Sequence, residues 1–189
     1  MRLTKTNVIL AMLMIPSLAM AHPGHHHHEA NFWTGFIHPF TGLDHLVMAL
    51  SFGVLMWSMS KGWKMLGVWG LVTALVVGFS LGAQGLISTQ FAEYGIMASL
   101  LVLAVSLWTK SNSIFPVAAV LLSIFHGSAH GSELAMNGNV AVQILGMISA
   151  MALIYAAGLA LGALIVKFVP QGKKILAAIA AIVAVIGLA

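Results

Sequence analysis

Two clusters in this 189-residue sequence combine histidines with a carboxylate in or beside a hydrophobic run. At the first, His38 lies six residues before Asp44, and His45 follows directly. At the second, His126 and His130 lie four residues apart and are followed by Glu133. Imidazole and carboxylate groups are the ligands that a borderline divalent metal ion prefers, and the chain has no cysteine to supply a thiolate. Both clusters are therefore candidate metal ligands.

Acidic residues are rare in this chain, which makes their positions informative. Only four are present, in a sequence that is 60% hydrophobic and 6% charged. The other two are Glu29, which closes the tract His25–His28, and Glu93, which opens a hydrophobic run. A carboxylate in a lipid environment is costly unless it is neutralised, paired or bound to a cation. We therefore expect the acidic residues to have a specific role.

The hydropathy of the chain predicts an integral membrane protein. Its mean hydropathy is +1.02, far above the range of soluble proteins. Hydrophobic runs of about 20 residues predict an all-α, polytopic bundle of about six transmembrane helices after an N-terminal signal peptide. The predicted spans are Phe40–Met59, Met65–Gln84, Ala92–Trp108, Ile114–Glu133, Val140–Val166 and Lys174–Ala189.

The N-terminal segment has the pattern of a secretory signal peptide. Arg2 and Lys5 precede a short apolar run, and Ala19 and Ala21 are the small residues of a cleavage site. We expect residues 1–21 to be removed, residues 22–39 to form a His-rich extracytoplasmic segment that begins at His22, and residues 40–189 to form the membrane domain. The alternative is an uncleaved first membrane helix.

Basic residues alternate between the predicted connections. The first, third and fifth connections contain lysines, and the second and fourth contain no Lys or Arg; the lysines are Lys61, Lys64, Lys110, Lys167, Lys173 and Lys174. Cytoplasmic loops carry an excess of positive charge, so this pattern places the mature N-terminus outside the cytoplasm. The lysines form no patch of the kind that binds nucleic acid.

This topology brings the candidate ligands to one depth. His38, Asp44 and His45 fall at the outer end of the first span, Glu93 in the first outer turn of the third, and the second cluster in the outer half of the fourth. The second cluster has i, i+4 and i+7 spacing, so its three side chains share one helical face. Gly127 and Gly131 lie beside this face, and we expect them to let a neighbouring helix approach closely and complete the coordination shell.

Each of these residues also has a simpler interpretation. His126 and His130 could hydrogen-bond other helices as a polar seam, Asp44 and Thr41 could cap a helix, and Glu93 could satisfy a helix N-terminus. The tract His22, His25, His26, His27 and His28 could capture metal or be a solvated linker. Pro39 disfavours helix at His38 and Gly42 loosens the chain, so we expect a helix entry or a broken turn over His38–His45.

The two motifs together resemble the HupE/UreJ family of nickel permeases. They read His38-Pro-x-x-Gly-x-Asp-His45 and His126-Gly-x-Ala-His-Gly-x-Glu133, after a mature start at His22-Pro23-Gly24-His25. The resemblance covers nearly the whole chain. It implies a permease of the bacterial cytoplasmic membrane that takes up nickel for hydrogenase or urease maturation, with the residues of both motifs, and Glu93 as a companion, at the metal site.

The sequence has no nucleotide-binding fingerprint and no soluble domain large enough to hydrolyse ATP, so any transport must be secondary or passive. We favour such a transporter over an enzyme. Nickel would be its cargo rather than a permanently bound cofactor, with cobalt or zinc as other ions suited to N and O ligands. The alternative function is an intramembrane zinc-dependent hydrolase acting on a lipid amide, with Ser51 or Ser128 assisting. Membrane haem binding and a purely structural protein are further alternatives, and the oligomeric state is left open.

Overall fold

The computed structural model describes residues 31–109, 113–134 and 139–188, with Glu133 and Leu134 described by their backbone only. The signal peptide and the histidine tract predicted before residue 31 lie outside the described residues. Within the described ranges the chain forms seven α-helices: α2 (Phe32–Thr41), α3 (Leu43–Trp57), α4 (Lys61–Ala83), α5 (Thr89–Trp108), α6 (Ile114–Leu134), α7 (Val140–Phe168) and α8 (Gly172–Gly187).

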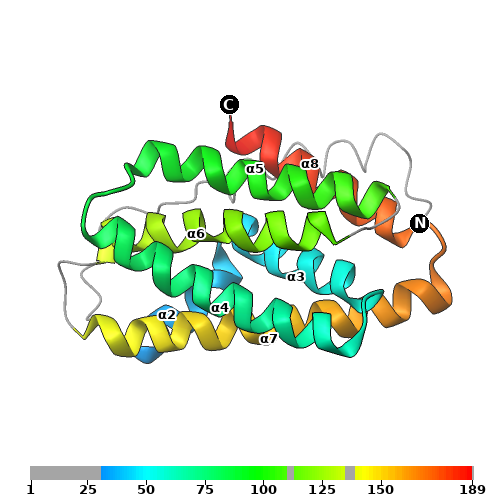
Figure 1. Ribbon diagram of the computed structural model, residues 1–189, viewed down its shortest axis with the longest axis horizontal. Helices are drawn as coiled ribbons and strands as arrows, with labels where there is room; N and C mark the ends of the chain where they lie inside the picture. Colours follow the sequence, from blue (N-terminus) through cyan, green and yellow to red (C-terminus); the bar gives the residue numbers. More distant parts are fainter. Residues whose placement is uncertain (1–30, 110–112, 135–138, 189) are drawn as a thin grey trace, which may run out of the picture.

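The long helices lie side by side along the long axis of the molecule, with α6 and α3 between an upper pair and a lower group (Figure 1). The upper pair is α5 with α8, and the lower group contains α4, α7 and the short α2. Polar residues begin several helices: the side chains of Asn31, Ser88 and Asn139 accept hydrogen bonds from backbone N–H groups in the first turns of α2, α5 and α7.

Four of the described helices, α4 to α7, are long and apolar enough to cross a membrane. A fifth crossing results if α2 and α3, which meet at a bend of 79°, form one broken span. The expected all-α multi-pass bundle is confirmed, but the structure does not support a full sixth span. α8 has 16 residues and rises about 24 Å, less than the roughly 30 Å of the hydrocarbon core. It ends at Gly187, beside Met97 in the middle of α5.

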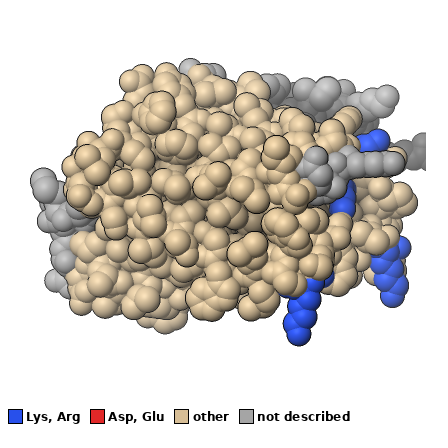
Figure 2. Space-filling view, viewed as in Figure 1, with Lys and Arg blue, Asp and Glu red and all other residues tan. Residues whose placement is uncertain are grey.

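The described lysines gather at one end of the bundle, as the alternation of charged loops predicts. Lys173 Nζ lies 2.6 Å from Ser58 Oγ, just after α3, and Lys174 lies over the ring of Trp108, at the end of α5. Lys64 of α4 lies over the ring of Trp57, at the end of α3. Figure 2 shows lysine side chains only at this end of the visible face. The loop between α4 and α5 at the opposite end carries no Lys or Arg.

Glycines bring α4 and α6 into backbone contact, as the predicted small-xxx-small pairs indicate. Four glycines make this contact, namely Gly78, Gly82, Gly127 and Gly131. A Cβ atom at any of them would overlap a backbone carbonyl oxygen of the opposite helix. The expectation that the helix beside Gly127 and Gly131 completes a coordination shell is wrong. That helix is α4, which carries no histidine or carboxylate.

Candidate metal centre

The break between α2 and α3 positions the first motif. Gly42 is both the C-cap of α2 and the N-cap of α3, with an extended backbone. A Cβ atom there would lie 3.0 Å from both Asp44 Oδ1 and His45 Nδ1, so the absence of a side chain lets these two groups fold back over the break. The bend turns α2 so that the ring of His38 meets that of His45, with centroids 5.5 Å apart.

The expected break in the helix is confirmed at Gly42, but His38 itself lies in the last turn of α2. Pro39 is accommodated inside the helix. A proline so close to the helix end removes only one backbone hydrogen bond, and the first turn is held by a reciprocal capping box between Asn31 and Thr34. The helix is also fixed against α7, where a Cβ at Gly35 would overlap the backbone of Gln143.

The second motif presents its histidines to the interior of the bundle. His126 and His130 are 0% and 2% exposed, and both lie on the face of α6 that meets the α2–α3 break. Asp44 and His45 are buried as well, at 9% and 5%. Buried polar groups of this kind need partners, because an unpaired one loses its hydration without compensation. Their arrangement therefore decides what this region can do.

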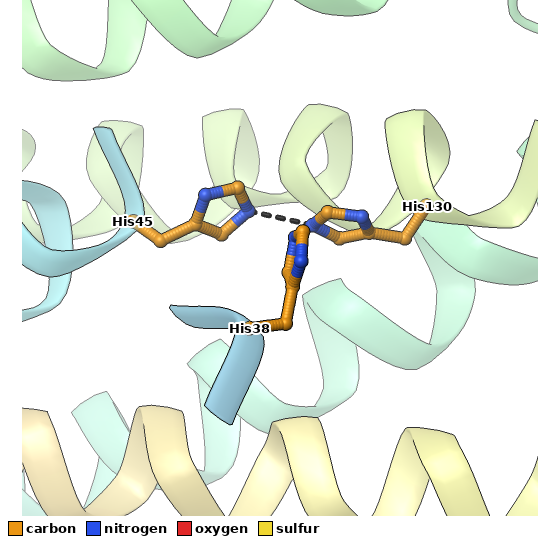
Figure 3. Close-up of side chains that lie close together, drawn as sticks. All are labelled: His38, His45 and His130. Atoms are coloured by element: carbon orange, nitrogen blue, oxygen red, sulfur yellow. Dashed lines mark hydrogen bonds between the residues drawn. The ribbon is translucent and has the colours of Figure 1, made fainter. Parts of the chain in front are cut away.

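The five side chains form two adjacent groups that share His45. His38, His45 and His130 make one group, and Asp44, His45 and His126 make the other, with ligand atoms within 4.8 Å of one another in each. Figure 3 shows the first group: His45 and His130 point their rings toward each other, and His38 approaches from α2.

Short distances hold the shared histidine in place. His45 Nε2 lies 2.6 Å from His130 Nε2, and His45 Nδ1 lies 3.0 Å from Asp44 Oδ2. Two nitrogens that bind one ion at about 2.1 Å stand about 3 Å or more apart. An ion would therefore open the contact between the two rings by only a few tenths of an ångström. Nitrogen and oxygen donors in this number suit nickel, cobalt or zinc.

Ser99 of α5 fixes the orientation of His126, a contact that the sequence analysis missed. Ser99 Oγ lies 2.6 Å from the carbonyl oxygen of Ile96 and 3.0 Å from His126 Nε2. The single hydroxyl proton is donated to the carbonyl, so Ser99 Oγ accepts a hydrogen bond from the Nε2–H group of His126. His126 Nδ1, which has no hydrogen-bond partner among the described residues, then keeps its lone pair for a metal ion. The available signal was a serine inside the apolar run of a predicted span.

The remaining candidates lie apart from these groups or outside the description. Glu93 is in the first turns of α5 but is exposed, and neither group includes it. Glu133 belongs to the last turn of α6, and its side chain is outside the described part of the structure. Ser51 and Ser128, considered for a hydrolase, are fully buried.

Comparisons with known proteins agree with the two motifs. Residues 10–189 match the family described as HupE / UreJ protein. The chain is also similar to "Protein HupE" of Rhizobium leguminosarum bv. viciae, with 32% identity over 171 residues, which cover 87% of this chain and 86% of that protein. No solved structure matches the chain.

Proposed function

Because the chain belongs to the HupE/UreJ family, we propose that it is a secondary transporter that takes up divalent nickel from the periplasm into the cytoplasm. The family is associated with nickel or cobalt uptake for hydrogenase and urease. The assignment to a multi-pass membrane protein of this family rests on the match itself and on the apolar helices.

One observation carries the proposal of a metal path. Side chains from α2, α3 and α6, up to 92 residues apart in sequence, supply four imidazoles and one carboxylate to two groups inside an apolar bundle. A site of this composition can replace the water shell of a divalent ion as it leaves the aqueous phase. If these side chains only joined helices by hydrogen bonds, the two groups would not need to have one histidine, His45, in common.

The charge distribution supports uptake rather than export. The lysine-rich end of the bundle is proposed to face the cytoplasm, which places the α2–α3 break toward the periplasm of the bacterial inner membrane. A membrane potential that is negative inside then favours entry of a doubly charged ion by about 4.6 kcal/mol per 100 mV. Accumulation would need no ATP hydrolysis.

In this proposal nickel is cargo and no cofactor is permanently bound. Cobalt and zinc are the competing ions, because the same donor atoms suit them. Glu133 and the histidines of residues 22–28 are proposed to assist capture at the outer surface, and hydrogenase or urease maturation is the proposed destination of the ion. No observation in the described residues favours the alternative of a zinc hydrolase acting on a lipid amide.

The test is nickel accumulation by cells that express the chain or a variant. His126→Ala should reduce membrane-potential-dependent uptake at least tenfold, because it removes a buried ligand. Ser132→Ala on the same helix is the control, since its hydroxyl donates to the carbonyl of Ala129 and faces Thr89 rather than the histidines. Equal uptake by the two variants at equal membrane levels would exclude the proposed site.

A further inference from the structure

Buried polar groups continue inward from the histidines along three helix faces. On α3, Met48 and Ser51 lie one and two turns after Asp44, on the same face. On α6, Ser123 lies one turn inward of His126, and its Oγ is 4.0 Å from Met48 Sδ. We call the five residues that continue this face on α3, α5 and α6 the inward seam: Met48, Ser51, Ser99, Ser106 and Ser123. All five are at most 1% exposed.

The hydroxyl groups of the inward seam offer oxygen lone pairs rather than protons. Ser99, Ser106 and Ser123 donate their protons to carbonyl oxygens of their own helices at 2.6, 2.8 and 2.8 Å. Ser51 Oγ is fully buried and has no hydrogen-bond partner among the described residues. A buried hydroxyl without a partner is unfavourable. Transient contact with a cation would offset this cost for Ser51, because Ser51 lies on the face of α3 that continues inward from Asp44.

The inward seam ends at a cavity near the lysine-rich end. This cavity has a volume of about 360 Å³, and Leu55, Ser106 and Lys173 are among its lining residues. Leu55 continues the α3 face one turn beyond Ser51. At the cavity, Lys173 Nζ donates a hydrogen bond to Ser58 Oγ at 2.6 Å, which ties the start of α8 to the end of α3. An ammonium group thus lies where the seam leaves the bundle.

We propose that the inward seam is the route by which the ion leaves the histidine groups, and that Lys173 closes its inner end. This inference rests on the proposed transport function and deepens it. Serine oxygens and the Met48 thioether offer the ion successive weak ligands, about one helical turn apart, after the stronger imidazoles. The Lys173 ammonium repels the arriving dication, so passage requires its hydrogen bond to Ser58 to break and α8 to move aside.

The first experiment separates the route from the binding site. Purified protein in liposomes is given Ni²⁺ outside and a potential that is negative inside, while Ni²⁺ binding is measured by calorimetry in detergent. Ser51→Ala should lower the flux about tenfold and leave the nickel dissociation constant within twofold. Ser128→Ala is the matched control, because its hydroxyl is equally buried and has no hydrogen-bond partner among the described residues, while its backbone packs against Gly82 of α4 and the residue is outside the inward seam.

The second experiment tests the closure. Lys173→Gln should raise the initial rate of Ni²⁺ entry at least threefold, whereas Lys173→Arg should keep the rate of the unmodified protein. Lys174→Gln is the control, because Lys174 lies at the same end of the bundle over the Trp108 ring and does not line the cavity.

The outcomes distinguish the two proposals. If the unmodified protein carries no Ni²⁺, the transport function and the route are both wrong. If it carries Ni²⁺ and Ser51→Ala matches Ser128→Ala, only the route is wrong. If Lys173→Gln matches Lys174→Gln, Lys173 does not close the inner end.

Discussion

Replacing Ser99 with alanine tests the hydrogen bond that orients His126. The variant removes the acceptor 3.0 Å from His126 Nε2 and adds no bulk to a fully buried position. Loss of a partner that orients a ligating histidine typically weakens metal binding 10- to 100-fold, which corresponds to about 1.4–2.7 kcal/mol. We therefore expect Ser99→Ala to raise the nickel dissociation constant by about this factor in calorimetry of the purified protein.

The control for this experiment is Ser106→Ala. Ser106 lies on the same face of α5, is equally buried and also donates to a carbonyl of its own helix, but it forms no hydrogen bond with a histidine of the described residues. Nitrogen NMR should in addition show the Nε2–H tautomer of His126 in the unmodified protein and a loss of this preference in Ser99→Ala only. Equal dissociation constants for Ser99→Ala and Ser106→Ala would refute the reasoning.

Two further predictions follow from the break and from the lysine-rich end. Gly42→Ala places a Cβ atom 3.0 Å from Asp44 Oδ1 and should weaken nickel binding about tenfold in calorimetry. Gly62→Ala is the control and should leave the nickel affinity unchanged, because a Cβ atom there meets only one atom, at 4.0 Å. Equal nickel affinities of the two variants would contradict this account. Because the chain has no cysteine, Leu86→Cys and Lys61→Cys provide single labelling sites. A membrane-impermeant maleimide should label Leu86→Cys in cells whose outer membrane has been made permeable. It should label Lys61→Cys only after the inner membrane has also been opened. The reverse labelling pattern would show that the proposed orientation is inverted.

The depth of the candidate ligands could be predicted from the sequence, but the direction in which each points could not. Span order and lysine alternation predicted correctly that the two histidine motifs lie at the same end of the bundle, opposite the lysines. The same reasoning placed Glu93 at the start of α5, where it is found. The sequence did not show which side of that helix faces the interior of the bundle, however, and Glu93 proves to be exposed.

The features that the sequence did not reveal depend on contacts between distant segments. Residues 32–41 contain a proline and form a helix because α2 is capped by Asn31 and packs against α7 through Gly35. In the sequence alone, Ser99 is one small residue in an apolar run. Its contact with His126 becomes visible only when α6 is placed beside it. The last hydrophobic run was long enough for a short span, but only the packing against α5 shows where α8 ends.

The sharing of His45 by both groups limits how many ions the protein can hold. The ligand atoms of each group lie within 4.8 Å of one another, and His45 belongs to both groups. Two dications about 5 Å apart repel each other by ~13 kcal/mol at an effective dielectric constant of 20. We therefore expect the two groups to hold one ion at a time, so that a second ion enters only after the first has moved on. Calorimetric titration should saturate at a single strongly bound nickel per chain in this pair of groups, and the throughput should level off as external nickel rises.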